Sequence, residues 1–265
     1  MSGGAKIRIE RLAKSFGDED SRVQALSDFT LSVGEGEFVS IVGPSGCGKT
    51  TVMRIVAGLE KPSAGVVSIV AGNGGARPQN AMVFQEQGLF PWMSVTDNVA
   101  YGLEMRGMKK GERREKVAPF LELIGLGRFR NHYPHQLSGG MRQRVGLARA
   151  FAADPEILLM DEPFGALDAQ NTLILQDELL RIWEGTRKTV LFITHAIDEA
   201  ITLSDRIVVM TALPGRIKEI VPVDLFPRPR APAELRADPR FGALQLSIWR
   251  MLEDEVRAAR RQAEA

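Results

Sequence analysis

The sequence predicts an α/β protein with a largely parallel sheet, and three observations carry this prediction. Short β-rich runs bounded by turn residues alternate with longer helical patterns along the chain. The runs Phe38–Val42, Ile157–Met160 and Val190–Thr194 are almost continuously apolar, which is typical of parallel strands covered on both faces. The composition of the 265 residues, 44% hydrophobic and 25% charged, excludes the disordered, collagen-like and disulfide-framework classes.

Charge and hydropathy further limit the classes of protein to which the chain can belong. The chain carries 34 basic and 33 acidic side chains, so its net charge of +1 provides no overall basic field for nucleic acid or anionic lipid. No secretory signal is evident, and the longest apolar stretches have strand length, whereas a membrane span needs about 20 apolar residues. The single cysteine, Cys47, fits a reducing compartment. We therefore expect any membrane role to come through a partner.

The elements can be predicted in order along the chain. The predicted strands are Lys6–Arg11, Phe29–Val33, Glu37–Val42, Val66–Val70, Ala81–Phe84, Ile157–Met160, Thr189–Thr194 and Arg206–Met210. Residues 94–153 carry helical signals instead, including an apolar stripe over 117–124 followed by a C-cap at Gly125. Pro119 within this stripe indicates a kink or a later helix start. We expect an inserted helical subdomain there.

The last part of the chain differs in composition. Four prolines between residues 222 and 232 predict an irregular connector, and a helix is expected from about Pro239 to Arg261. Leu244, Ile248 and Leu252 lie on one face of this helix, which predicts that it packs on its own domain.

The strongest motif lies between the strand Phe38–Val42 and a helix-like run. It consists of Gly43, Pro44, Ser45, Gly46, Cys47, Gly48, Lys49 and Thr50, and matches G-x-x-x-x-G-K-[ST] in full. Its backbone N–H groups can surround phosphate oxygens, Lys49 can reach the β- and γ-phosphates, and Thr50 can ligate Mg²⁺. The strand and helix on either side favour this interpretation over a chance glycine-rich turn. Cys47 is either a reactive thiol or, as we favour, a residue that acts through its backbone.

Two further motifs point to the same chemistry. Asp161 and Glu162 follow the apolar run Ile157–Met160, which places two carboxylates at the edge of the sheet where α/β proteins bind ligands. Asp161 can hold Mg²⁺ and Glu162 can polarise a water for attack on the γ-phosphate. The turn Leu137–Met141 opens a helix at Ser138, Gly139 and Gly140, which indicates either a second anion site or an ordinary N-cap.

In this order and spacing, the motifs resemble the ATP-binding subunits of ABC transporters over roughly Lys6 to Arg216. The resemblance assigns Walker A to Gly43–Thr50, with Thr51 as a further nucleotide-binding residue, and Walker B to Ile157–Glu162. It assigns the signature to Leu137–Met141, although Met141 stands where Gln is commoner. It further implies that Gln85 is a Q-loop residue that contacts Mg²⁺ and water, and that a D-loop ends at Asp168. It also implies that His195 is the switch histidine at the γ-phosphate and that Phe16 stacks on adenine. Taken from the residues alone, His195 could instead be a core histidine and Gln85 a polar strand end.

The resemblance also implies fold, cofactors and partners. It predicts a P-loop NTPase (RecA-like) mixed-sheet core with an N-terminal antiparallel β part, formed by residues 1–93 and 154–216, a helical signature subdomain at 94–153 and a C-terminal connector and helix at 217–265. The expected ligands are ATP and Mg²⁺. The expected assembly is a homodimer that works with transmembrane permease subunits and, indirectly, with a periplasmic solute-binding protein. The dimer is expected to be peripheral on the cytoplasmic face of the inner membrane, and no nucleic-acid partner is expected.

Short segments point to a branch of bacterial importers. The run from Leu89 to Asn98, Pro214–Ile217 and Phe226–Arg230 resemble importers of nitrate, sulfonates and taurine. Trp92 in the first of these runs is either core of the helical subdomain or part of a docking surface for a membrane partner. The alternatives are a soluble ABC-type ATPase acting on nucleic acid or ribosomes, disfavoured by the net charge and the single cassette, and a small-molecule kinase, which would lack the Leu137–Met141 turn.

Overall fold

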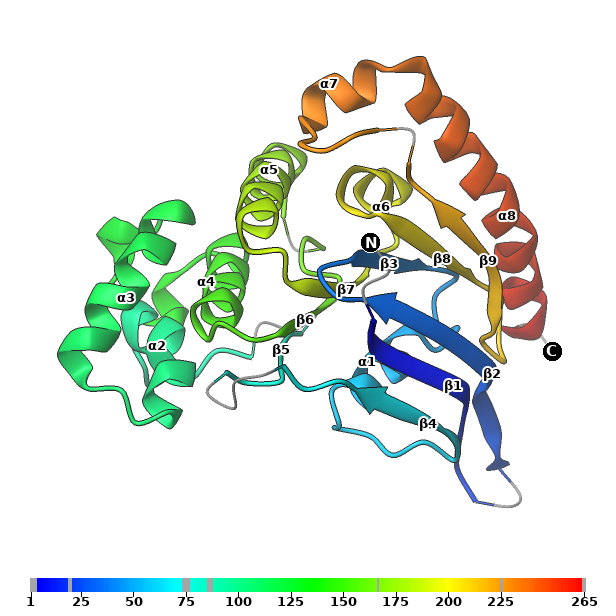
Figure 1. Ribbon diagram of the computed structural model, residues 1–265, viewed down its shortest axis with the longest axis horizontal. Coiled ribbons are helices and arrows are strands. Elements are labelled where there is room, and N and C mark those ends of the chain that lie inside the picture. The colour runs from blue at the N-terminus through cyan, green and yellow to red at the C-terminus, as the bar shows by residue number, and fades with distance from the viewer. Residues whose placement is uncertain are drawn as a thin grey trace. The chain divides into compact units, whose positions relative to one another are not determined.

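The computed structural model describes residues 4–18, 21–72, 77–84, 88–165, 167–224 and 226–263 (Figure 1). The chain forms two compact units. The first unit comprises residues 1–71 together with 183–265, and the second unit comprises residues 72–182.

The first unit contains an antiparallel sheet formed by the start of the chain. Its strand order is β2-β1-β4, with β1 at Ala5–Phe16, β2 at Val23–Gly34 and β4 at Ala64–Ile69. Ile7, Ile9 and Leu12 of β1 are fully buried. Both strands of the β1–β2 pair extend further than predicted, because Lys14, Ser15 and Phe16 continue the ladder opposite Leu26, Gln24 and Val23.

A mixed sheet lies at the centre of the first unit. β3 (Phe38–Val42) pairs in parallel with β7 (Thr189–Ile193) and with β8 (Arg206–Met210), while β9 (Ile217–Pro222) pairs antiparallel to β8. Every residue of β3 and β7 is buried, as their continuous apolar runs predicted. Helix α1 (Lys49–Val56) follows β3 after the glycine-rich loop.

The end of the chain packs on this sheet. Helix α8 (Pro239–Ala263) confirms the predicted final helix, and it contacts α6 (Ile197–Leu203), α7 (Pro232–Ala237) and β8. Ile248 and Leu252 are buried in one cluster with residues of α6, and Leu244 packs against it. The described residues between 223 and 231 form neither helix nor strand, as the prolines predicted, and β9 and α7 adjoin this connector on either side.

The second unit combines a parallel strand pair with helices. β5 (Asn80–Val83) pairs in parallel with β6 (Ile157–Asp161). The helices are α2 (Val95–Met105), α3 (Lys110–Leu123), α4 (Gly139–Ala152) and most of α5 (Ala169–Thr186), with short 3₁₀ turns at Gly127–Phe129 and Pro134–Gln136. Together the strands and helices confirm the predicted fold class: a mixed sheet, an N-terminal antiparallel β part and a helical region.

Helix α3 resolves the question of Pro119. The helix continues through Pro119, which is exposed, so water can satisfy the carbonyl that the proline leaves without a helical partner. Gly125 follows the C-cap with φ 68°, the left-handed conformation expected at that position.

The finer division into three regions stays a prediction. None of the described helices combines the length and hydropathy that a bilayer crossing requires.

Candidate functional site

The glycine-rich loop of the first unit owes its shape to its backbone. Gly46 and Gly48 adopt φ values of 77° and 98°, the left-handed region that favours glycine. A Cβ at Gly48 would lie 2.8 Å from Leu26 Cδ2 and 2.9 Å from the Ala25 carbonyl oxygen. Gly48 is also the N-cap of α1, so the loop leads directly into the free N–H groups of a helix start. This arrangement can bind an anion.

Lys49 places a cation in the same loop. Its side chain is only 7% exposed, and Nζ donates hydrogen bonds to the carbonyl oxygens of Gly43 and Pro44, each at 2.8 Å. The Lys49 ammonium therefore lies against the first two residues of the loop. Thr50 and Thr51 follow in the first turn of α1, partly exposed.

Cys47 is a packing residue within this loop. It is 1% exposed, and burial raises the pKa of its thiol, an effect that the nearby Lys49 ammonium only partly offsets. A Cβ at Gly43 would lie 2.8 Å from Cys47 Sγ, so the sulfur fills the space beside that glycine. A neutral, buried thiol contradicts the reactive-thiol alternative and favours a role through the backbone.

Gly215 supports the loop from behind, and the sequence did not single it out for this role. A Cβ at Gly215 would lie 2.0 Å from the carbonyl oxygen of Cys47. Gly215 also donates to the Ala25 carbonyl at 2.9 Å and accepts from Ser27 N–H at 3.1 Å. The Pro-Gly pair at 214–215 signals a turn, but the sequence alone does not bring it to the phosphate loop.

His195 lies on a turn between β7 and α6. Its side chain is exposed, which contradicts the core-histidine alternative. The turn is fixed by Thr194, whose hydroxyl accepts from Ala196 N–H at 3.0 Å and donates to Glu199 Oε2 at 2.5 Å. Burial raises the pKa of Glu199, so this carboxyl group titrates above its usual range.

Phe16 ends strand β1 and is 43% exposed. The Lys14 ammonium lies 4.8 Å from the centre of the Phe16 ring and 2.6 Å from Glu60 Oε1. An exposed aromatic ring can stack on a planar heterocycle such as a base. A hollow lined by Ser15 and Gly17, the two sequence neighbours of Phe16, lies beside it.

In the second unit, the two predicted carboxylates stand at the end of β6. Asp161 is the last residue of the strand and is 3% exposed. Glu162 follows with φ 45°, a left-handed conformation that costs a non-glycine residue about 1–3 kcal/mol. Gly165 N–H donates to the Glu162 carbonyl oxygen at 3.2 Å and closes the turn. Such local strain clusters at ligand and active sites.

The turn at Ser138–Gly140 and the segment ending at Asp168 come together in the second unit. Ser138 is the N-cap of α4, and its hydroxyl accepts from Met141 N–H at 3.3 Å, so the N-cap alternative describes its local geometry. A cavity of about 190 Å³ lies between the two segments. Its lining residues are Ser138, Gly140, Met141, Arg144, Leu167, Asp168 and Asn171.

Two residues of this cavity were missed in the sequence. Arg144 donates to Asn171 Oδ1, and Asn171 N–H donates to Asp168 Oδ1 at 3.0 Å. Hydrogen bonds from Asn171 lower the pKa of Asp168, so this carboxylate stays ionised. Arg144 lies four residues after Gly140 on the same helix face, a spacing that could have pointed to it. The cavity thus has a helix N-terminus and a guanidinium in its wall, and both suit an anion.

Trp92 lies on the loop before α2 and is 70% exposed. The core alternative for Trp92 is therefore wrong. The loop is held by Asn98, which is fully buried: its Nδ2 donates to the carbonyl oxygens of Phe90 and Met93, and its Oδ1 accepts from Phe90 N–H. The Phe90 ring lies 5.6 Å from that of Trp92.

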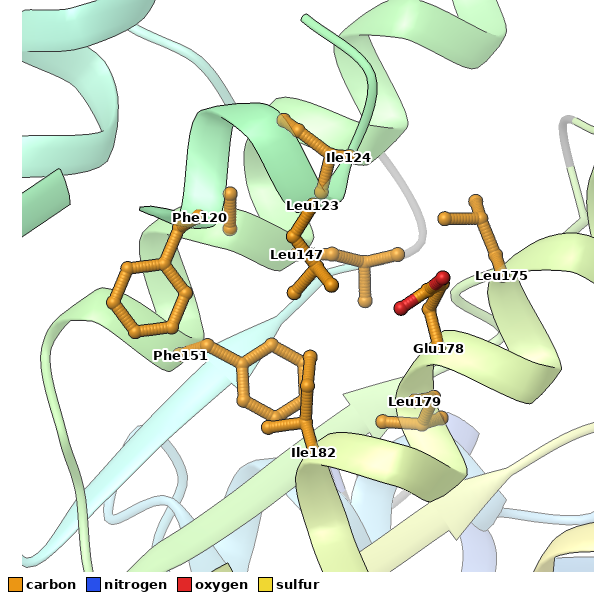
Figure 2. A pocket seen from close by; sticks show the side chains of 10 residues that line it. Phe120, Leu123, Ile124, Leu147, Phe151, Leu175, Glu178, Leu179 and Ile182 are labelled. Atoms are coloured by element: carbon orange, nitrogen blue, oxygen red, sulfur yellow. The ribbon is translucent and has the colours of Figure 1, made fainter. Parts of the chain in front are cut away.

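Figure 2 shows another cavity of the second unit, lined by none of the predicted site residues. It is lined by apolar side chains of α3, α4 and α5 together with the carboxylate of Glu178. Gln85 lies outside the described residues, as does Ala166 of the D-loop. Of the other predicted site residues, Phe16, the phosphate loop and His195 belong to the first unit, whereas Ser138–Gly140, Asp161, Glu162 and Asp168 belong to the second.

A buried strand, a glycine loop with an embedded lysine and a helix start define a P-loop nucleotide-binding protein. Comparison with known proteins identifies the family: residues 26–165 match the ABC transporter family. An ABC transporter ATP-binding protein of Methanocaldococcus jannaschii is 51% identical over 255 residues, which cover 95% of this chain and 92% of that protein. The chain belongs to the ABC transporter family as an ATP-binding subunit, and it is an ATPase of that type.

Two further comparisons add detail. The taurine import ATP-binding protein TauB of Pseudomonas aeruginosa (strain PAO1) is 43% identical over 252 residues, covering 92% of this chain and 94% of that protein. A solved structure of the dimeric ATP-binding cassette MJ0796, in a post-hydrolysis state bound to ADP and Pi, matches with a TM-score of 0.75. It is 33% identical, covering 83% of this chain and all of that one.

Proposed function

We propose that this chain is the ATP-hydrolysing subunit of an importer that takes up a small anion or organosulfur compound, such as taurine, another sulfonate or nitrate, through separate permease subunits. The observation that carries this proposal is the 43% identity with a taurine import ATP-binding protein over almost the full length of both chains. The solute class rests on this similarity, because no contact with a solute is expected in an ATP-binding subunit.

The phosphate loop is the proposed nucleotide site. Backbone N–H groups of Gly43–Thr51 hold the phosphate oxygens, and Lys49 exchanges its bonds to the Gly43 and Pro44 carbonyls for the β- and γ-phosphates. Phe16 stacks on the adenine ring. The left-handed glycines Gly46 and Gly48 support this assignment, because they allow the backbone to curve around an anion.

Mg²⁺ is the proposed metal. Thr50 offers a hydroxyl, Asp161 a carboxylate and Gln85 an amide carbonyl, which are the oxygen donors that Mg²⁺ prefers alongside nucleotide phosphates and water. Bound there, the metal supplies positive charge that offsets the charge developing on the transferred phosphoryl group.

Glu162 is the proposed general base. Its carboxylate accepts a proton from the water that attacks the γ-phosphate. His195 holds the γ-phosphate by a hydrogen bond, and Gln85 orients the water. The strained backbone at Glu162 and the hydrogen-bonded turn at His195 support these roles, because strained and tightly held backbone clusters at active sites.

A homodimer completes the proposed site. Ser138, Gly139, Gly140 and Asp168 of a second copy approach the γ-phosphate, which binds to the N-terminus of α4. The dimeric state of the related cassette MJ0796 supports this arrangement, as do the helix N-terminus and the Arg144 guanidinium in the wall of the cavity between Ser138 and Asp168.

The exposed loop around Trp92 is the proposed docking surface for the permease. An aromatic side chain that is 70% exposed on a rigid loop fits a protein interface. The subunit then lies on the cytoplasmic face of the membrane, and a periplasmic binding protein delivers the solute from the other side.

Uptake by a deletion strain tests the proposal. The strain should lose growth on taurine or another sulfonate as the sole sulfur source, or on nitrate as the sole nitrogen source, and keep growth on sulfate and ammonium. The wild-type gene should restore growth and the Glu162→Gln gene should not. Normal uptake of all three kinds of compound by the deletion strain would contradict the proposed solute class, and rescue by Glu162→Gln would contradict the role of ATP hydrolysis.

A further inference from the structure

The short helix α6 begins two residues after His195, and its position determines where the histidine turn lies. Glu199 in α6 accepts from Thr194 Oγ1 at 2.5 Å, and Thr194 Oγ1 accepts from Ala196 N–H at 3.0 Å. A displacement of α6 therefore moves the residues on both sides of His195. The C-terminal segment (residues 223–263) holds α6 at both ends and along one face.

Arg230 holds the C-terminal end of α6. Its guanidinium is 7% exposed and donates to the carbonyl oxygen of Ser204 at 2.6 Å and to that of Ile201 at 3.2 Å. Further donors reach the carbonyls of Val223 at 2.6 Å and Phe226 at 3.0 Å. The last carbonyls of a helix carry partial negative charge and lack helical partners, so a guanidinium with five donors suits them. Burial lowers the pKa of Arg230 to about 10.

Arg228 adds a second contact at this end. It donates to the Leu203 carbonyl at 2.6 Å and to Asp205 Oδ1 at 2.9 Å, and its guanidinium lies 4.1 Å from the centre of the Trp183 indole. Asp205 Oδ2 in turn accepts from Phe38 N–H at 2.9 Å, at the start of β3. This end of α6 is thus tied to the strand that leads into the phosphate loop.

Arg236 in α7 holds the opposite end. Its guanidinium lies 2.8 Å from Asp198 Oδ2, and Asp198 is the second residue of α6. The pair is about one-third exposed, so it contributes little to overall stability while restricting where the first turn of α6 can lie.

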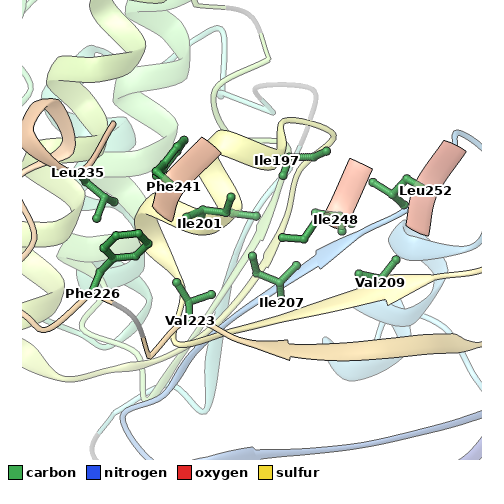
Figure 3. Packing of buried hydrophobic residues seen from close by; sticks show 12 residues of the cluster. Ile197, Ile201, Ile207, Val209, Val223, Phe226, Leu235, Phe241, Ile248 and Leu252 are labelled. Carbon is green, nitrogen blue, oxygen red and sulfur yellow. The ribbon is translucent and has the colours of Figure 1, made fainter. Parts of the chain in front are cut away.

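The face of α6 is covered as well. Figure 3 shows Ile197 and Ile201 of α6 packed in one cluster with Leu235, Phe241 and Ile248 of the C-terminal segment. Ile201 and Ile248 are fully buried. The seven-residue helix is too short to be stable by itself and depends on these contacts for its position.

We propose that Arg228, Arg230 and Arg236 are positioning residues for His195, because they fix α6 and, through the Thr194–Glu199 contact, the turn that presents the imidazole. The C-terminal segment thus affects ATP hydrolysis through the position of His195 and not through contact with the nucleotide. The inference rests on the proposed role of His195 at the γ-phosphate.

Purified full-length variants test the inference. Arg230→Lys keeps the charge but replaces the planar donor set with a single ammonium. We expect its kcat for ATP hydrolysis to fall about 10-fold, since a small misplacement of a catalytic group has effects of that order. Its affinity for ATP, measured with a fluorescent analogue, should change by less than about twofold, because the phosphate loop is untouched. Arg236→Ala should show the same pattern with a smaller loss.

Arg257→Ala is the matched control. Arg257 belongs to the same segment, but its ion pair with Glu253 lies on the exposed side of α8, and the variant should keep wild-type kcat. Because the single ammonium of Arg230→Lys leaves some of these buried carbonyls without donors, this variant can fail to fold, and Arg236→Ala then carries the test.

A double-mutant cycle with His195→Ala separates positioning from general destabilisation. In single-turnover hydrolysis, Arg230→Lys and Arg236→Ala should add less than about twofold to the loss caused by His195→Ala. A full additional loss in that background, or an unchanged kcat of both arginine variants in the wild-type background, would overturn the inference. A His195→Ala variant with wild-type kcat would instead refute the proposed role of His195 itself.

Discussion

The phosphate loop of the first unit and the Ser138–Asp168 cavity of the second unit are both suited to anions, yet they are built differently. The phosphate loop is shaped by backbone: left-handed glycines, a lysine bonded to loop carbonyls, and Gly215 in close contact behind Cys47. The cavity is shaped by side chains, with Arg144, Asn171 and Asp168 linked by hydrogen bonds at its wall. The first should therefore be sensitive to an added Cβ, and the second to the loss of polar side chains.

The largest effect is expected at Glu162, the proposed general base. Glu162→Gln keeps the shape of the side chain and removes the base, so kcat should fall by about 10²–10⁴ while ATP still binds. Because ATP then persists between two copies, the variant with ATP should elute as a dimer in gel filtration, and wild type with ADP as a monomer. A monomeric Glu162→Gln at saturating ATP would contradict the two-copy site.

Removal of the cation from the phosphate loop should have the next largest effect. Lys49→Ala should lower kcat by about 10²–10³ and strongly weaken ATP binding, because in the proposed site Lys49 supplies charge to the phosphates in the ground state and during transfer. Steady-state hydrolysis and equilibrium nucleotide binding check this. Near-normal turnover would refute the assignment of this loop.

An added methyl group tests the backbone-built loop directly. Gly48→Ala forces a residue with a Cβ into φ 98° and against Leu26, so the free energy of unfolding should fall by about 1–2 kcal/mol or more, and ATP affinity about 10-fold. Gly58→Ala is the matched control, since Gly58 has φ 75° with nothing within 4 Å and lies outside the loop. It should lose stability but keep ATP affinity, as measured by thermal melts and nucleotide titration.

Loss of a side chain tests the cavity. Arg144→Ala removes its guanidinium and should weaken the ATP-dependent dimer of Glu162→Gln about 5–10-fold, in line with the net contribution of about 1 kcal/mol from an ordinary hydrogen bond. ATP binding by the single subunit should not change. Sedimentation of the double variant over a range of concentrations measures the effect, and an unaltered dimer affinity would show that the cavity does not meet the nucleotide.

Cys47→Ser should have the smallest effect. Its hydrolysis should stay within about twofold of wild type, because the buried thiol fills space and the loop binds through backbone. A large loss of activity with an unchanged melting temperature would assign a chemical role to the sulfur.

Much of the fold could be predicted because continuous apolar runs identify buried parallel strands. β3, β6 and β7 lie where those runs predicted them. Strand β9 was missed because the run Ile217–Pro222 is short and interrupted by Lys218 and Glu219, and its pairing with β8 is a tertiary contact. Local patterns carry no information about such an edge strand.

The candidate site shows the same limit. Motifs that are continuous in sequence, such as Gly43–Thr50, could be located residue by residue. Gly215 could not, because it gains its role from Cys47, which lies far along the chain. Asn171 could not, because no local pattern shows that it joins Arg144 to Asp168 in one cavity, although the spacing of Arg144 from Gly140 could have pointed to that arginine. For Trp92 and His195 the sequence left open whether each is a core residue, and the exposure of both side chains in the structure decided against that alternative.

The hydrogen bonds of Asn98 bear on which residues of the loop before α2 fix its path and which are free to vary. The buried side-chain amide of Asn98 forms hydrogen bonds with the backbone of residues 90–94, which belong to no helix or strand. The path of that loop therefore depends on a residue of α2. The tip residue Trp92 contributes little to that path. If Trp92 docks a partner as proposed, the residue that meets the partner and the residue that fixes the loop are separate, so a different side chain at position 92 would alter which partner surface fits while the loop keeps its course.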